Sequence, residues 1–204
     1  MSPKDFKVVL WDFDGVIIDS NPVREYGFRQ VLRDFPENQV EKLIRFHNEN
    51  GGLSRYVKFR YFFEKILKKS ITEDVIILLS EEFSLIMREK LTESRLLIKE
   101  IIEYIHQLFN YGTEMHIVSG SDQEELRTLI KSHGLNKYFT SIKGSPTDKN
   151  TLVKKIIAEN KFNKDNFCLV GDSINDFEAA NLSNIVFFGY NNNSLKKFDR
   201  YLEF

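Results

Sequence analysis

The chain has 204 residues, which at roughly 150 residues per domain predicts one domain or one and a half. Hydrophobic residues make up 42% and charged residues 29%, a globular composition that excludes disordered and fibrous proteins. Lys and Arg number 29 against 30 Asp and Glu, so the basic surplus of a nucleic-acid binder is missing. The single cysteine, Cys168, excludes an internal disulfide and a multi-cysteine zinc site.

The apolar runs of the chain are all short, far below the roughly 20 residues that span a bilayer. The first of them ends at once in Asp12, so we expect no signal peptide. We therefore expect a cytoplasmic protein with neither a membrane nor a nucleic acid as partner. The oligomeric state is left open.

Short apolar runs predict buried β-strands, the first over residues 6–11. Similar runs follow at residues 115–118, 139–142, 167–170 and 185–188. Between the last four lie stretches with helical spacing, such as Leu126, Leu129 and Ile130 on one face. Strands that alternate with helices of this length predict a doubly wound parallel sheet, covered on both faces.

A long region without any strand pattern interrupts this alternation after the first strand. Helices are expected from about Pro22, where proline suits a first helical turn, and over residues 37–50, 53–69 and 72–90. The sequence therefore predicts an α/β core of residues 1–19 and 92–204, with a helical insert of residues 20–91.

Polar segments follow the predicted strands, at the edge where doubly wound sheets bind their ligands. The first strand leads into Asp12-Phe13-Asp14-Gly15 and the second into Ser119-Gly120-Ser121-Asp122. The fourth leads into Gly171-Asp172-Ser173-Ile174-Asn175-Asp176, and Lys149 opens the helix before that strand.

The carboxylates of these segments would repel one another strongly unless a cation joined them. Oxygen ligands without cysteine or clustered histidine suit a hard ion, and Mg²⁺ is the cofactor that we expect. A hydroxyl from Ser119 and the ammonium of Lys149 suit a dianion such as phosphate. Small residues beside Ser119 and Asp172 would let backbone amides approach that anion closely.

The four segments resemble, in order and spacing, the four motifs of the haloacid dehalogenase superfamily, in its Mg²⁺-dependent phosphotransferase branch. The specific pair is Asp12-x-Asp14-Gly15 with Gly171-Asp172-Ser173-x-x-Asp176. The insert is similar to the C1-type cap of phosphoglycolate phosphatases and β-phosphoglucomutases. The resemblance implies a Rossmann-like core and hydrolysis of a small phosphorylated metabolite.

The same resemblance implies a role for each matching residue. Asp12 would be the nucleophile that forms an aspartyl-phosphate, and it would also contact the metal. Asp14 would be the general acid and base, with its backbone carbonyl facing the metal. The remaining positions are implied as ligands: Asp172 and Asp176 for the metal, and Ser119, Gly120 and Lys149 for the phosphoryl group.

The third motif departs from the pattern of many relatives, which carry lysine directly before proline. Here Ser145 precedes Pro146, and Lys149 follows three residues later. Lys143 is therefore an alternative phosphoryl-binding lysine. We prefer Lys149, because it opens a helix with a regular apolar face.

Two glycines, Gly51 and Gly52, form a predicted flexible turn inside the insert. In similar proteins this loop closes over the active site and selects the substrate. Arg55 and Lys58 would then contact an anionic or hydroxyl-rich leaving group. The alternative is a surface turn with a solvated arginine.

Two other functions use similar residues. A phosphomutase of the β-phosphoglucomutase type would keep the phosphoryl group from water. A non-catalytic phosphoacceptor or binding module, such as a receiver domain, also places acidic residues, a hydroxyl and a lysine on a parallel sheet. Receiver domains are shorter, however, and lack a helical insert after the first strand.

Overall fold

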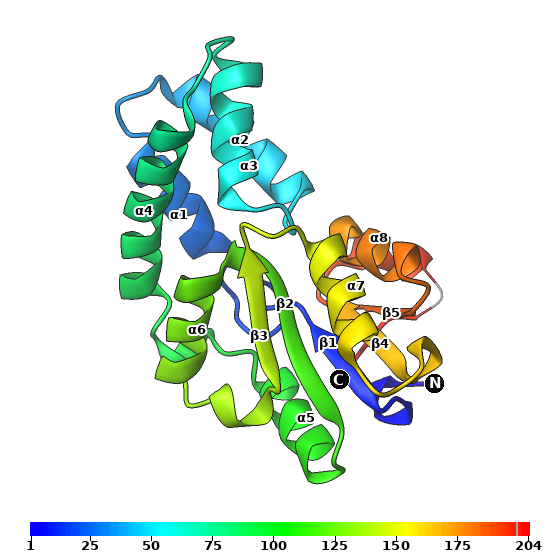
Figure 1. Cartoon of the computed structure of the whole chain (residues 1–204). Helices are drawn as coiled ribbons and strands as arrows, with labels where there is room; N and C mark the ends of the chain where they lie inside the picture. Colours follow the sequence, from blue (N-terminus) through cyan, green and yellow to red (C-terminus); the bar gives the residue numbers. More distant parts are fainter. Residues whose placement is uncertain (199) are drawn as a thin grey trace.

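A five-stranded parallel sheet in the order β3-β2-β1-β4-β5 forms the centre of the computed structural model, which describes residues 1–198 and 200–204 (Figure 1). Every neighbouring pair of strands is parallel, with β1 in the middle. The chain winds outward in both directions from β1, as a doubly wound sheet does. The strands are β1 (Val8–Trp11), β2 (Glu114–Asp122), β3 (Ser141–Ser145), β4 (Phe167–Gly171) and β5 (Val186–Gly189).

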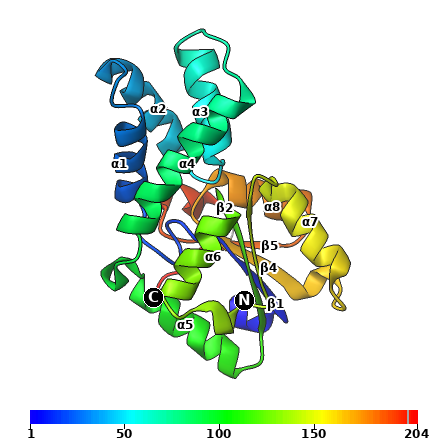
Figure 2. The same ribbon diagram turned by 60° about the vertical axis from the view of Figure 1, so that its left-hand side comes forward.

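Helices cover both faces of this sheet, because alternate residues of each strand point to opposite sides. Val9 and Trp11 of β1 belong to the core that includes α5 (Lys99–Asn110) and α6 (Gln123–Ser132). Val8 and Leu10 pack instead with α7 (Lys149–Glu159) and α8 (Ile174–Leu182), on the other face (Figure 2). The predicted α/β fold is confirmed, although the sequence analysis made no separate prediction for α5.

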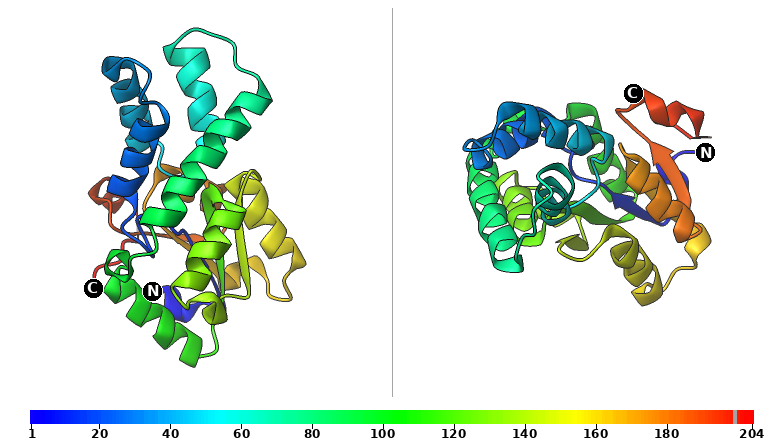
Figure 3. Two further views of the ribbon diagram at one scale, coloured as in Figure 1. Left: turned by 90° about the vertical axis from the view of Figure 1, so that its left-hand side faces the viewer. Right: turned by 90° about the horizontal axis from the view of Figure 1, so that it is seen from above.

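Four helices between β1 and α5 rise beyond the carboxyl edge of the sheet (Figures 1 and 3). They are α1 (Asn21–Val31), α2 (Glu37–Glu49), α3 (Arg55–Tyr61) and α4 (Glu73–Lys90). Buried aromatic rings join α1, α3 and α4: the centroid of the Phe28 ring lies 5.4 Å from that of Phe59 and 4.5 Å from that of Phe83. Burial of such rings stabilises the contact between helices. No helix in the described part of the chain is long and apolar enough to cross a membrane.

Three predicted elements differ from those observed. The second strand, expected over residues 115–118, continues to Asp122, so Ser119 and Gly120 lie within β2 and not after it. The helix expected over residues 53–69 is α3 followed by a turn of π-helix, Phe62–Ile66, which brings both Phe62 and Phe63 against Phe35. The strand expected over residues 139–142 begins instead at Ser141, because the 3₁₀ turn Asn136–Tyr138 leads up to it.

Candidate active site

The carboxyl ends of β1, β2 and β4 meet at one place. Trp11 lies opposite Ile117 on one side and Val170 on the other, so the residues that follow the three strands share one edge. The backbone N–H of Asp12 donates to the carbonyl of Val170 at 2.9 Å and holds Asp12 at that edge. The polar segments of the sequence therefore come together at the centre of the sheet.

Three carboxylates and one ammonium form the centre of the site. Asp12, Asp172 and Asp176 each offer an oxygen atom, and these oxygens all lie within 4.8 Å of one another. Lys149 Nζ lies 2.9 Å from Asp12 Oδ1 and also pairs with Asp176. Lys143 is half-buried on β3 and pairs with no carboxylate of residues 1–198 and 200–204.

The carboxylates of this group are poorly solvated and repel one another. Burial and the neighbouring Asp176 raise the pKa of Asp12 to about 7, although Lys149 acts in the opposite direction. Burial, Asp12 and Asp176 also hold the pKa of Asp172 well above its usual range. When all three carboxylates are ionised, the single ammonium does not neutralise them, and the cluster carries an excess negative charge. An all-oxygen donor set with that excess fits a divalent cation such as Mg²⁺.

The capping box of α8 holds Asp176, and a glycine in the loop after β1 leaves room for Asp172. Asp176 forms a capping box at the start of α8, where its carboxylate accepts from the backbone N–H and the hydroxyl of Ser173. Gly15 adopts a φ of +74°, and a Cβ there would lie 2.0 Å from Asp172 Oδ2. A side chain at position 15 would therefore displace the Asp172 carboxylate.

Ser119 and Gly120 lie where β2 meets the helical insert. The buried Ser119 hydroxyl accepts from the backbone N–H of Ser121 at 3.1 Å. A Cβ on Gly120 would lie only 2.3 Å from the carbonyl oxygen of Gly52. The loop of the insert therefore rests directly on the strand end, with no room for a side chain between them.

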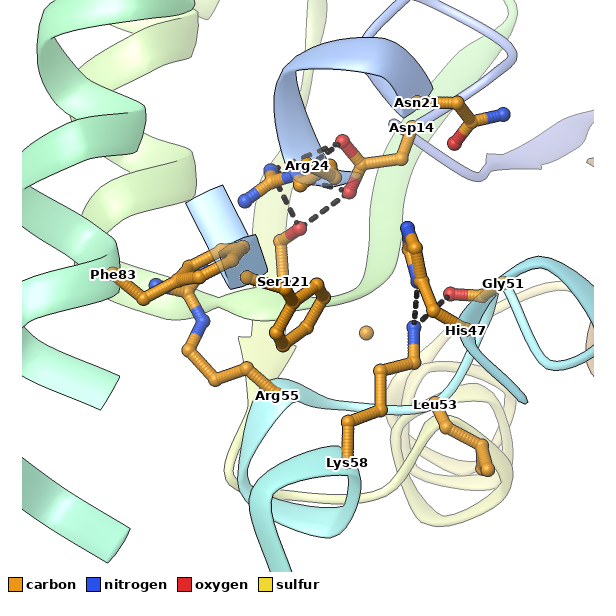
Figure 4. Close-up of a pocket in the computed structure, with 12 residues that line it drawn as sticks. Asp14, Asn21, Arg24, His47, Gly51, Leu53, Arg55, Lys58, Phe83 and Ser121 are labelled. Atoms are coloured by element: carbon orange, nitrogen blue, oxygen red, sulfur yellow. Dashed lines mark hydrogen bonds and ion pairs between the residues drawn. The ribbon is translucent and has the colours of Figure 1, made fainter. Parts of the chain in front are cut away.

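Asp14 is surrounded by donors that the sequence analysis did not assign to it. Its carboxylate accepts from Arg24 Nε at 3.0 Å and from the Ser121 hydroxyl (Figure 4). It also accepts from the Ser20 hydroxyl at 2.5 Å. Burial acts to raise the pKa of Asp14, but Arg24 and the two hydroxyls overcome it and lower this pKa to about 2. Asp14 is therefore an ionised, fully hydrogen-bonded carboxylate in this arrangement.

A buried ion-pair network joins the insert to the core. Glu125 of α6 is fully buried and pairs with Arg24 of α1 at 2.6 Å and with Arg55 of α3 at 2.7 Å. Arg55 is only 4% exposed, and it also donates to Ser84 and lies over the Phe83 ring. The alternative of a solvated arginine at position 55 is wrong. The residues next to Glu125 in the sequence do not indicate this role. Its partner Arg24 lies 101 residues earlier in the chain, and Arg55 lies on a helix of the insert.

Replacing Glu125 with alanine is expected to lower the free energy of unfolding by about 3–5 kcal/mol. The change leaves two buried guanidinium groups without their shared counter-ion. Urea denaturation measures the loss. Glu124→Ala is the matched control, because Glu124 is exposed and, among residues 1–198 and 200–204, pairs only with Arg127. A surface pair of this kind is worth at most about 1 kcal/mol. Equal losses of unfolding free energy in the two variants would contradict the prediction that the buried network stabilises the fold.

Two cavities open above the carboxylates, and both are lined by Asp14, Asn21, His47 and Gly51. The smaller, of about 30 Å³, is also lined by Arg24, Arg55 and Lys58, and the larger, of about 530 Å³, by Asp172. Lys58 is buried in the insert, and both predicted insert residues, Arg55 and Lys58, line the smaller cavity together with Asp14 (Figure 4). His47 is a lining residue that the sequence analysis did not assign to the site.

Mg²⁺ is expected to raise the melting temperature of the protein, and to raise it more at pH 8 than at pH 5. The pKa of Asp12 is about 7 in the folded state, against an ordinary value of 3.8. At a pH between these two values, Asp12 is protonated in the folded protein and ionised in the unfolded chain. Rising pH in that window destabilises the metal-free protein. The ion binds only the deprotonated carboxylates, so its effect grows with pH.

At about 100 times the dissociation constant, binding adds about 2.7 kcal/mol, or roughly 5–10 °C in melting temperature. Differential scanning calorimetry with and without Mg²⁺ measures this shift, and Asp172→Asn is expected to reduce it. An equal shift at both pH values would contradict the prediction.

An acidic cluster with a lysine and a serine, at the switch point of a doubly wound sheet, defines an α/β enzyme with its active centre at the carboxyl edge. The chain belongs to the haloacid dehalogenase-like hydrolase family, whose model matches residues 9–190. It is a phosphatase of that superfamily and acts on phosphoesters.

The chain is similar to one curated protein in sequence and to two solved structures in fold. The chain is 25% identical to the phosphoglycolate phosphatase of Vibrio parahaemolyticus over 211 residues, which cover 93% of this chain and 85% of the relative. CbbY from Rhodobacter sphaeroides in complex with xylulose-(1,5)bisphosphate has a TM-score of 0.78 at 13% identity, covering 97% of this chain and 93% of CbbY. The HAD-hydrolase YfnB from Bacillus subtilis bound to magnesium has a TM-score of 0.67 at 16% identity, covering 91% and 89%.

Proposed function

We propose that this phosphatase hydrolyses a small phosphomonoester in a Mg²⁺-dependent reaction, through an aspartyl-phosphate on Asp12. The observation that carries the proposal is the position of Asp12, 2.9 Å from Lys149 and in one cluster with Asp172 and Asp176. The lysine and a divalent cation would neutralise the negative charge of the substrate's phosphoryl group. A buried carboxylate beside them is then suited to attack the phosphorus atom.

The proposed reaction has two steps. Asp12 attacks phosphorus, the bond to the ester oxygen breaks, and Asp14 gives a proton to the leaving oxygen. Asp14 then takes a proton from the water that attacks the aspartyl-phosphate, which releases phosphate and restores Asp12. Lys149, Ser119 and the backbone at Gly120 would hold the phosphoryl oxygens.

This role of Asp14 requires a rearrangement. Arg24, Ser20 and Ser121 keep the carboxylate ionised, with its pKa lowered to about 2, and an ionised carboxylate has no proton to give. The proposal therefore requires that Asp14 leave Arg24 when substrate binds. Arg24 would keep its ion pair with Glu125.

Asp12, Asp172 and Asp176 would hold the metal, together with the backbone carbonyl of Asp14. Mg²⁺ at this position would reduce the repulsion between the carboxylates and the substrate phosphate. The magnesium bound to YfnB supports the choice of ion.

We also propose that residues 20–91 act as a cap over a core of residues 1–19 and 92–204. The close approach of Gly52 to Gly120 supports this, because the insert's loop covers the strand end that carries Ser119. A cap that excludes bulk water favours small substrates. The names of the relatives, phosphoglycolate phosphatase and a complex with a sugar bisphosphate, support a small phosphorylated metabolite.

The test is phosphate release from a panel of small phosphomonoesters, measured with Mg²⁺ and with a chelator. Release that depends on the metal is expected. A phosphomutase has the same residues, but would release little phosphate and would instead isomerise a sugar phosphate. Release that persists in chelator would overturn the metal's role, and no release with any ester would overturn the proposed hydrolysis.

A further inference from the structure

The outer face of α4 carries exposed apolar side chains. This helix lies at the margin of the molecule, and no other element of the described chain covers its outer side (Figures 1 and 3). Leu78 is 64% exposed, Leu85 62% and Ile77 42%. Because an α-helix has 3.6 residues per turn, these three positions lie within about 100° of one another around the helix. An apolar patch of this kind is typical of a surface that contacts another protein.

Two charges of opposite sign share this face. Glu81 and Arg88 are both exposed and lie about two turns apart on α4. The neighbouring Glu82 pairs with Arg33 at 2.7 Å. In the part of the chain that the structure describes, neither Glu81 nor Arg88 forms an ion pair. The face therefore presents a free negative and a free positive group, with Leu85 between them.

A groove of about 440 Å³ runs beside this face. Residues of α4, α3 and the end of β2 line it, among them Tyr56, Ile77, Glu81, Leu85, Arg88 and Asp122. The buried Ser80 hydroxyl also lines the groove and has no hydrogen-bond partner. The face is therefore a ridge with a hollow next to it, and the hollow has room for a side chain of a second molecule.

Opposite charges two turns apart make the face complementary to itself. In a two-fold dimer, a residue that contacts a second residue of the other copy is contacted by that same residue in turn. When two copies of α4 pack antiparallel about an axis near Leu85, each Glu81 faces Arg88 of the other copy. Shifting the helices until Leu78 faces Leu85 would instead place Glu81 against Glu82, and two carboxylates repel. Charge therefore selects the first arrangement.

We propose that the chain forms a two-fold dimer through the outer face of α4, with a second copy of itself as the partner. Leu85 packs at the axis, and two Glu81–Arg88 ion pairs flank it. The proposal does not rest on the phosphatase function, because it uses no residue of the active site. A standard interface buries about 800 Å² on each partner, more than one helix face supplies, so we expect a weak dimer with a Kd of about 10 µM.

Sedimentation velocity at protein concentrations from about 1 to 200 µM measures the association. The average mass is expected to rise from that of one chain toward that of two. Leu85→Asp is expected to remain monomeric, because dimerisation would bury unpaired charges at the axis. Leu182→Asp is the matched control: Leu182 is 54% exposed at the end of α8, and this variant is expected to dimerise like the wild type.

Charge reversals test the arrangement itself. Glu81→Arg opposes two positive groups and Arg88→Glu two negative groups, so each single variant is expected to raise the Kd by at least about 10-fold. A mixture of the two single variants restores both ion pairs in one heterodimer, and combining the two changes in one chain restores them in a homodimer. Both are expected to associate with a Kd within about 3-fold of the wild type. Glu103→Arg, on the exposed side of α5, is the control for the change in net charge.

A wild-type protein that stays monomeric over the whole concentration range would overturn the proposal. Association that Leu85→Asp leaves unchanged would also overturn it, because the contact would then lie on another face. Failure of the two charge-reversed variants to associate with each other would exclude the antiparallel pairing of Glu81 with Arg88. Circular dichroism verifies that each variant is folded, and phosphate release is measured independently of these results.

Discussion

Replacing Asp12 with asparagine is expected to lower turnover of every phosphomonoester by about 100,000-fold or more. The amide has nearly the same shape as the carboxylate but is a poor nucleophile, so no aspartyl-phosphate forms. Burst and steady-state measurements of phosphate release check the loss. Mass spectrometry of the quenched wild-type reaction is expected to show the phosphorylated enzyme, and Asp12→Asn is expected to show none.

The control for Asp12 is a change of the same kind outside the site. Asp165 is exposed in the turn that precedes β4, at the opposite edge of the sheet, and Asp165→Asn is expected to keep full activity. Thermal unfolding verifies that the Asp12 variant is folded. Turnover within about 10-fold of wild type in folded Asp12→Asn would exclude Asp12 as nucleophile.

Replacing Lys149 with alanine is expected to lower kcat by about 1,000- to 10,000-fold. The Lys149 ammonium contacts both Asp12 and Asp176. Burial acts to lower the pKa of Lys149, but the two carboxylates outweigh it and raise this pKa, so the ammonium remains charged. Without this ammonium, the repulsion between the substrate phosphate and the carboxylates is less compensated. Single-turnover kinetics at saturating substrate and Mg²⁺ measure the loss in the chemical step.

Lys143→Ala is the matched control for Lys149, because it removes the other lysine that the third motif offers. Lys143 lies half-buried on β3, on the far side of β2 from β1, and is expected to contribute less than about 2-fold to kcat. A large loss in Lys143→Ala, with near-normal turnover in Lys149→Ala, would reverse the assignment of the two lysines.

The fold follows closely from the sequence because its strands are buried on both faces. A strand of this kind is a short apolar run, and all five runs overlap the observed strands, with ends that differ by at most four residues. The third strand was placed too early, since Phe139 is buried without being part of it. Burial alone therefore does not distinguish a strand from the turn that leads into it.

The helical insert was recognised by its periodicity, but its internal geometry was not. A 3.6-residue pattern predicts a helix over Leu53 and beyond, and it does not reveal the π-helical turn at Phe62–Ile66. At that turn Phe62 and Phe63 both contact Phe35, which lies outside the helix. Tertiary packing, which local pattern does not encode, decides such irregularities.

The sequence by itself determined the parallel sheet and the carboxylates, hydroxyl and lysine that follow its strands, because topology brings the ends of parallel strands to one edge. Only the tertiary structure decided how the insert lies on that edge. Arg24 on Asp14, Glu125 between two arginines, and His47 beside Lys58 are contacts between side chains on separate elements. The packing of the helices determines which side chains are partners. The burial that strengthens these electrostatic interactions exists only in the folded chain.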